Sequence, residues 1–149
     1  MRTLAIGVAL TAAAMTLAPP ASAELWPGNY NMIIPDRRDF HTWVWAANPC
    51  PPAITFSPDC VYISANPMPI AKAYGFYGIA KLEDGQYTMT IDDPIGLRCG
   101  DIYYGPVVPT HDVYTWDATT LAGTLVSSFD AGCDGRPGTL TYPFWLTRF

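Results

Sequence analysis

The sequence predicts a single all-β domain, an antiparallel sandwich or small barrel of about seven to nine short strands held by two disulfides. Three observations favour this class. The 149 residues include 15 prolines and 12 glycines, which are spread along the chain and leave no room for a long helix. Short runs of alternating apolar and polar residues lie between these turn signals. The four cysteines are even in number, as a disulfide framework requires.

Residues 1–23 have the three parts of a secretory signal peptide. Arg2 supplies a positive start, residues 4–17 are apolar and uncharged, and Ala21-Ser22-Ala23 forms a small-residue cleavage site. The apolar run is shorter than the roughly 20 residues that a membrane-spanning helix needs, and no later stretch is long enough. We therefore expect a β domain of residues 24–149 that is secreted or held in the cell envelope without a transmembrane anchor.

Three runs of alternating residues mark strands in the first half of the domain. Residues 30–34 and 61–65 carry apolar side chains at every second position, and so do residues 87–91. The last run follows Asp84-Gly85, and an Asp-Gly between alternating runs is the strongest short-range signal for a β-hairpin. We predict a hairpin that turns at these two residues.

The stretch 40–50, FHTWVWAANPC, predicts a further strand that runs into a cysteine. Alternation puts Trp43 and Trp45 on one face, and the opposite face is also largely apolar, which favours a central strand covered on both sides. Large aromatic side chains dominate core burial, so we expect at least one of the two rings in the core, facing residues 87–91. A binding surface that stacks on a sugar or lipid chain is the alternative.

The second half contains three more alternating runs, at residues 112–117, 124–129 and 140–149. Asp117 is placed to cap a single helical turn, and Gly123 to end that turn in a left-handed conformation. Pro143 has no backbone N–H, so the last strand is expected at an edge or with a break in its ladder.

The cysteines Cys50, Cys60, Cys99 and Cys133 all follow the signal peptide. In an exported chain they predict two disulfides, for which three pairings are possible. We favour Cys50–Cys60, which flanks one proline-rich loop, and Cys99–Cys133, which ties two later loops together. No cysteine lies in a CxxC pair and the two histidines are far apart, so we expect no metal site and no cofactor.

The charge balance excludes some partners. Without Arg2, seven basic side chains face 13 acidic ones, a net charge near −6. An acidic chain without a basic cluster argues against binding to nucleic acid or to anionic lipid surfaces.

Catalytic residues are not indicated. His41 and His111 are the only histidines, and neighbours such as His111 and Asp112 point to opposite faces of a strand. Asp92-Asp93-Pro94 is typical of a turn, and residues 130–135 lack the ligand pattern of a calcium loop. A hydrolase whose histidines and acids converge only in the fold is the alternative, and a cleft that holds a histidine beside an acid would favour it.

Exposed aromatic side chains are the remaining candidates for binding. Tyr103 and Tyr104 are adjacent, so one of them is expected at the surface, and Trp145 lies opposite the apolar face of the last strand. Together with the alternative for Trp43 and Trp45, these residues are able to stack on sugars or to anchor a protein partner. The competing interpretation is an aromatic cover over a barrel end.

Several motifs follow one another in a particular order: Gly28-x-Tyr30, Thr42-Trp43, Cys50 with Cys60, Gly85-x-Tyr87, Cys99, the stretch YTWDATTLAGTL, Cys133 and Pro143-Phe144-x-Leu146-x-Arg148. Their order resembles that of uncharacterised small exported proteins of mycobacteria and related actinobacteria. The resemblance covers nearly all of residues 24–149. It implies export, paired cysteines and a compact β fold, and it implies no reaction.

These observations together predict an exported, non-enzymatic protein that acts as a binding or interaction module. An envelope glycan, a lipid or a protein is the expected partner. A small secreted hydrolase of envelope carbohydrate or lipid is the alternative, and a structural envelope protein or host-directed effector would have the same sequence features.

Overall fold

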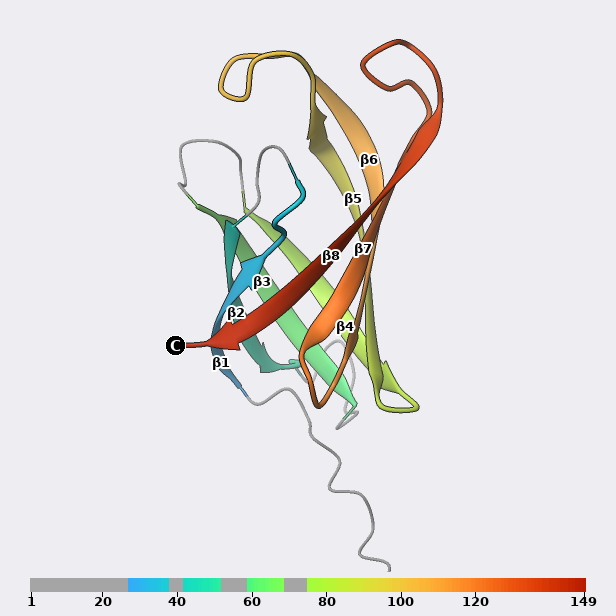
Figure 1. Ribbon diagram of the computed structural model, residues 1–149. Coiled ribbons are helices and arrows are strands. Elements are labelled where there is room, and N and C mark those ends of the chain that lie inside the picture. The colour runs from blue at the N-terminus through green and yellow to red at the C-terminus, as the bar shows by residue number, and fades with distance from the viewer. Residues whose placement is uncertain (1–26, 38–41, 52–58, 69–74) are drawn as a thin grey trace, which may run out of the picture.

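A computed structural model describes residues 27–37, 42–51, 59–68 and 75–149. Eight antiparallel strands follow one another around a closed barrel (Figure 1). Among the described residues no helix is long and apolar enough to cross a membrane. The expected all-β domain is confirmed, and it is a barrel. The strands are β1 (Gly28–Ile33), β2 (Thr42–Pro49), β3 (Cys60–Pro67), β4 (Phe76–Glu83), β5 (Gln86–Arg98), β6 (Val107–Asp117), β7 (Ala122–Phe129) and β8 (Gly138–Arg148).

The wall of the barrel is continuous around its circumference only in the lower part of the molecule. At the closing seam, β1 pairs with β8 only between Trp145 and Arg148. On the other side, the β4–β5 register stops at the pair Lys81–Thr88. Beyond these points β5 to β8 continue as a four-stranded sheet that rises above the other strands (Figure 1). We call this sheet the upper wall; it comprises residues 89–98, 107–114, 125–129 and 138–144.

Aromatic side chains fill the closed part of the barrel. Trp43 and Trp45 are 2% and 1% exposed, so both lie in the core and neither belongs to the surface. The ring of Trp45 lies 5.5 Å from that of Trp116, on the opposite side of the barrel, and 5.5 Å from that of Tyr114. Tyr87 stacks on Trp116 at 5.3 Å, so the ring network includes the expected partner strand. The indole N–H groups of Trp45 and Trp116 have no hydrogen-bond acceptor among the described residues.

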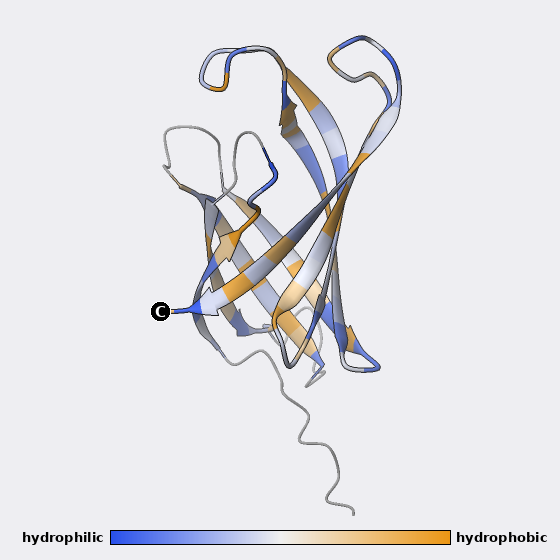
Figure 2. Cartoon of the chain, in the orientation of Figure 1, coloured by the Kyte–Doolittle hydropathy of each residue, from blue (hydrophilic) through white to orange (hydrophobic). Residues whose placement is uncertain are grey.

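The outer face of β2 differs from the prediction. Thr42, Val44 and Ala46 point outward and are half-buried, whereas Trp43, Trp45 and Ala47 on the inner face are buried. Among the described residues, the strands form a single barrel with no second sheet over this outer face. An apolar outer face misled the prediction, because alternation shows which residues share a face and not what covers that face. Figure 2 shows hydrophobic and hydrophilic residues alternating along the strands.

The β4–β5 hairpin turns at Asp84 and Gly85, as predicted. Both residues have positive φ, 51° and 78°, which is the geometry of a two-residue type I′ turn. Asparagine, aspartate and glycine tolerate this conformation, which is why the Asp-Gly pair is informative.

The β6–β7 connection follows the prediction in part. Asp117 Oδ1 accepts the N–H groups of Thr119 and Thr120 at 2.9 and 2.6 Å, so the cap forms. The left-handed residue, however, is Leu121 (φ 59°), and Gly123 already lies in β7. A Cβ at Gly123 would lie 2.6 Å from the Trp116 Cβ and 2.8 Å from the Phe144 ring. The glycine is therefore needed for close packing of the core against β7.

Pro143 lies where β8, among the described residues, has no strand neighbour on its β1 side. The N–H of Leu146 donates to the Leu121 carbonyl on the β7 side at 2.9 Å. Because N–H groups point alternately to the two sides of a strand, the Pro143 nitrogen faces away from β7, beyond the last residue of β8 that pairs with β1. The missing donor costs no ladder hydrogen bond, and the predicted edge position is confirmed.

Asp92-Asp93-Pro94 does not form the predicted turn. The three residues lie inside β5, where the register with β6 shifts between Asp93 and Leu97. The Asp93 carboxylate accepts the N–H of Ile95 at 2.9 Å, which satisfies a backbone donor within the irregular segment. The turn-forming residues thus produce a bulge, and the strand continues beyond it.

Both predicted disulfides are present. Cys50–Cys60 joins the end of β2 to the start of β3, with the Cα atoms 5.6 Å apart. Cys99–Cys133 joins the β5–β6 connection to the β7–β8 connection, with the Cα atoms 5.4 Å apart. The second bridge therefore links the two tips of the upper wall.

Candidate functional site

A layer of polar side chains is buried above the aromatic core, on the inner face of the upper wall. All five are at most 5% exposed, although four of them lie on strands whose other inward residues are apolar. We call them the polar layer: Arg37, Asp93, Thr110, Asp112 and Ser127.

Strand register and one connection assemble this layer. Asp112 and Ser127 are direct partners on β6 and β7, and the Ser127 hydroxyl donates to Asp112 Oδ1 at 2.5 Å. Arg37 enters from the β1–β2 connection and donates to the Gly96 carbonyl. A Cβ at Gly96 would collide with the Thr110 hydroxyl, so glycine is needed where β5 approaches β6. Arg37 thereby ties the connection to the upper wall.

The buried carboxyl of Asp112 favours its protonated form. Burial raises its pKa above the ordinary 3.8, and the negative charge of Asp93 adds to this effect. The nearby hydroxyl groups of Ser127 and Thr110, and the charge of Arg37, lower the pKa in part. Burial likewise raises the pKa of the Tyr114 phenol, next along the inner face of β6. Burial thus shifts the titration of both groups towards higher pH.

A groove of about 900 Å³ lies on the upper wall and spans all four of its strands. Asp92, His111, Ser128 and Thr139 form a row across the groove, because each is the direct register partner of the next. His111 Nδ1 lies 2.7 Å from Asp92 Oδ1. The Ser128 hydroxyl donates to the backbone carbonyl of His111 at 3.2 Å. The fold thus brings a histidine beside an acid in a hollow, while Asp112 points to the opposite face, as predicted.

The charge in this groove has one sign. Asp92 and Asp130 line it with exposed side chains, whereas Asp93, which also borders it, is buried in the polar layer. None of its described lining residues is lysine or arginine. Its apolar surface comes from Phe129 and from three prolines, 94, 109 and 137. The groove therefore combines acceptors for a positive group with apolar surface for the carbon atoms around that group.

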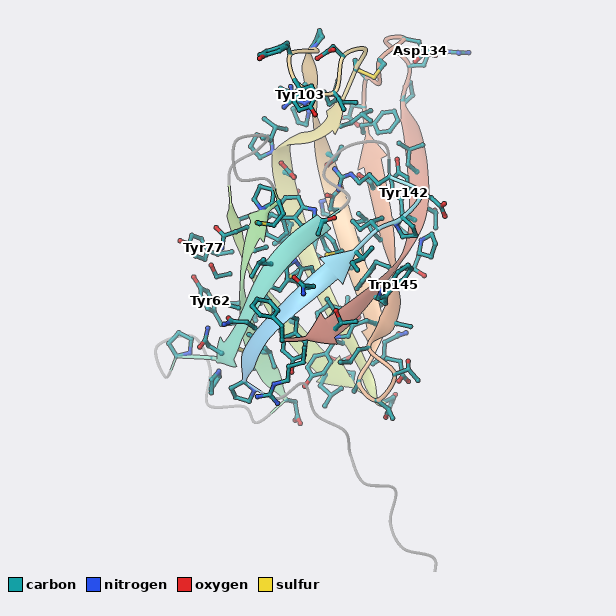
Figure 3. The ribbon with its side chains drawn as sticks, turned by 60° about the vertical axis from the view of Figure 1, so that its left-hand side comes forward. Tyr62, Tyr77, Tyr103, Asp134, Tyr142 and Trp145 are labelled. Atoms are coloured by element: carbon teal, nitrogen blue, oxygen red, sulfur yellow. A yellow bond between two sulfur atoms is a disulfide. The ribbon has the colours of Figure 1, made fainter. Side chains whose placement is uncertain are left out.

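The surface aromatics singled out in the sequence do not form one site. Tyr103 and Tyr104 are 56% and 93% exposed, in a turn whose backbone N–H groups donate to Asp101. Both are thus at the surface, because they lie in a connection and not on the two faces of a strand. Trp145 is 39% exposed and lies far down β8, away from Tyr103 (Figure 3).

Two other residues considered in the sequence lie elsewhere. Asp134 pairs with Arg136 at 2.5 Å in the β7–β8 connection, and this hydrogen-bonded contact lowers the pKa of Asp134. No group of three or more His, Cys, Asp or Glu side chains in the described part of the chain is arranged to hold a metal ion. His41 and residues 1–23, which the sequence predicts to be a signal peptide, lie outside the described residues.

Sequence reasoning missed the Asp92–His111 pair and the polar layer. Asp92 and His111 are 19 residues apart, and they meet only because a bulged β5 pairs with β6 in one particular register. The sequence contained one signal of the polar layer. Asp112 and Ser127 each lie two residues from an apolar core residue on the same strand, so alternation places both polar side chains on the inner face.

The chain matches no protein-family model, and it is significantly similar to no curated protein and to no solved structure.

Proposed function

We propose that the chain is an exported, non-enzymatic binding module that holds a cationic peptide segment in the groove of the upper wall. The observation that carries the proposal is the lining of that groove, which has the exposed carboxylates of Asp92 and Asp130 and no lysine or arginine among its described residues. Export is supported by the signal-peptide pattern of residues 1–23 and by the two disulfides, which are typical of oxidising compartments.

The filled interior supports a site on the wall. Small barrels whose interiors are packed with side chains have no room for a ligand at the axis. Here the rings of Trp43, Trp45 and Trp116 occupy that space and are at most 2% exposed. The proposed partner therefore binds at the surface, where the groove combines exposed acidic side chains with apolar ones.

The strength of such binding depends on salt. An ion pair between exposed groups contributes about 0.2–1 kcal/mol, so several contacts and the apolar surface must act together. Interactions between exposed charges are largely screened beyond about 10 Å at 0.1 M salt. We expect weak, salt-sensitive association with a lysine-containing peptide and none with an acidic one.

The test uses fluorescent hexalysine and hexaglutamate as probes, with anisotropy measured at low and high salt. We expect hexalysine to bind, and the double change Asp92→Asn with Asp130→Asn to weaken it at least fivefold. Asp36→Asn, which removes an exposed carboxylate from the β1–β2 connection outside the groove, is the matched control and should leave affinity unchanged. Equal losses in both variants, or equal binding of hexaglutamate, would refute the proposal.

A hydrolase is the second candidate, because His111 lies 2.7 Å from Asp92 and beside Ser128. In that function His111 would accept the proton of the Ser128 hydroxyl. Two features place it second: the Asp92 side chain is 90% exposed, and the Ser128 hydroxyl donates to a backbone carbonyl. Hydrolysis of nitrophenyl esters that disappears in both His111→Gln and Ser128→Ala would reverse this order.

A further inference from the structure

A second aromatic surface lies on the outer face of β3 and β4, on a different side of the barrel from Trp145 (Figure 3). The rings of Tyr62 and Tyr77 are stacked, with centroids 5.8 Å apart and planes 14° from parallel. Tyr77 is 67% exposed, the second most exposed large hydrophobic side chain after Tyr104 among the described residues. Neither tyrosine was a candidate in the sequence.

Strand pairing explains why these rings meet. Tyr62 pairs with Ile79 and Ser64 pairs with Tyr77, so the two tyrosines are diagonal neighbours on one face of an antiparallel pair. Diagonal neighbours are within reach of each other when the side chains are aromatic. The stack is therefore built into the β3–β4 register and presents a flat apolar surface to solvent.

A hollow of about 700 Å³ adjoins this stack. Besides the two rings, its lining includes Lys81, Glu83, Thr88 and Thr90. Its size falls within the roughly 300–1,000 Å³ of sites that bind small molecules. The hollow thus joins a stacking surface to a rim of hydrogen-bonding groups.

The hollow lies over a seam in the barrel wall. The β4–β5 register ends at Lys81–Thr88, so Thr90 lies beyond the last pair. On the inner side, the side chains of Met89 and Ile91 pack against Gly78, where a Cβ would collide with them. The hollow thus lies where the β4–β5 pairing has ended, next to the stacked tyrosines.

We propose that this surface binds the pyranose rings of a neutral glycan. The apolar face of a pyranose stacks on an aromatic ring, and its hydroxyl groups take donors and acceptors from the rim. The rim offers one ammonium group, one carboxylate and two hydroxyls, so its formal charges cancel. Lys81 disfavours a cationic ligand over the rings and Glu83 disfavours an anionic one, which leaves a neutral, hydroxyl-rich molecule as the best match.

This site is independent of the groove on the upper wall. The two hollows share no lining residue, so changes at Tyr77 and at Asp92 test the two proposals separately. A glycan bound here would leave the groove free.

The experiment titrates the mature protein with three neutral hexasaccharides: cellohexaose, chitohexaose and maltohexaose. Backbone amide shifts are followed by NMR. We expect at least one saccharide to shift the amides of Lys81, Thr88 and Thr90. Tyr77→Ala should weaken that binding about tenfold, equivalent to about 1.4 kcal/mol, and Tyr77→Phe should retain it. Tyr104→Ala, at an exposed tyrosine outside the hollow, is the matched control.

Three results would overturn the proposal. The first is that no hexasaccharide shifts these amides, and the second is that Tyr77→Ala binds as tightly as the parent. The third is that Tyr77→Phe loses as much affinity as Tyr77→Ala, because the contact would then depend on the hydroxyl and not on the ring face. Thermal melts of all variants confirm folding, since Tyr77 is mostly exposed.

Discussion

At the scale of single residues, the inner face of this barrel separates two kinds of buried side chain. Indoles and phenols occupy the closed part, and the polar layer with Asp112 lies above them. Alternation in the sequence places both kinds of side chain on the inner face. It does not show which groups surround the buried carboxyl of Asp112, because these groups come from other segments of the chain. The core tryptophans were therefore predictable, and the partners of Asp112 were not.

Trp45 is expected to carry a large share of the packing energy. Removing a buried tryptophan side chain costs about 3–5 kcal/mol, because it loses its transfer free energy and leaves a cavity. Trp45→Ala should lower the melting temperature sharply, since typical domains have a stability of only about 5–15 kcal/mol. Val44→Ala, on the half-buried outer face of the same strand, is the control and should cost much less. Equal melting temperatures for Trp45→Ala and the parent would contradict the packed core.

Asp112 makes a prediction about pH. Its pKa is raised in the folded protein above the ordinary 3.8, so its stabilising contribution is complete below that value and is lost as pH rises through the folded pKa. Asp112→Asn stays neutral and still accepts from Ser127. The free energy of unfolding, measured in urea between pH 4 and pH 8, should therefore shift in favour of the variant as pH rises. A difference that shifts towards the parent would mean that Arg37 holds Asp112 ionised.

At the scale of elements, the sequence predicted those features that depend only on residues close together in the chain. The Asp84-Gly85 turn and the edge position of Pro143 follow from backbone geometry within a few residues. The bulge at Asp93 and the row through His111 depend on pairing with a distant strand. Turn-forming residues mark both a turn and a bulge, and only long-range pairing decides between them.

Gly123 shows how an element is adapted to the core. Its predicted role was conformational freedom, but the left-handed residue is Leu121. A Cβ at Gly123 would lie within 2.8 Å of Trp116 and Phe144, so Gly123→Ala should cost about 1–3 kcal/mol through overpacking. Gly135→Ala, at φ 77° with open space around the Cβ position, isolates the conformational penalty and should cost about 1 kcal/mol. Urea denaturation of both variants measures the difference, and equal costs would exclude the packing role.

At the scale of the whole molecule, the chain combines a closed barrel with an open upper wall. The wall has one edge along β8 beside Pro143 and another along β5 above Lys81–Thr88. Its tips are tied by Cys99–Cys133. The barrel has a continuous aromatic core, whereas the wall is held by the polar layer, which includes Arg37, and by this disulfide. Local stability should therefore be lower in the wall.

Removing the upper disulfide tests this division. On the chain-entropy model, a bridge that closes a loop of 34 residues contributes about 3.8 kcal/mol to the free energy of unfolding. In Cys99→Ser with Cys133→Ser, we expect hydrogen exchange to accelerate most at the upper ends of β6 and β7, near Val108 and Ser128. The amides of Trp45 and Trp116 should keep their protection until global unfolding. The matched variant, Cys50→Ser with Cys60→Ser, leaves the upper wall tied and should not accelerate exchange there selectively. Uniform acceleration in the first variant would show that wall and barrel open as one cooperative unit.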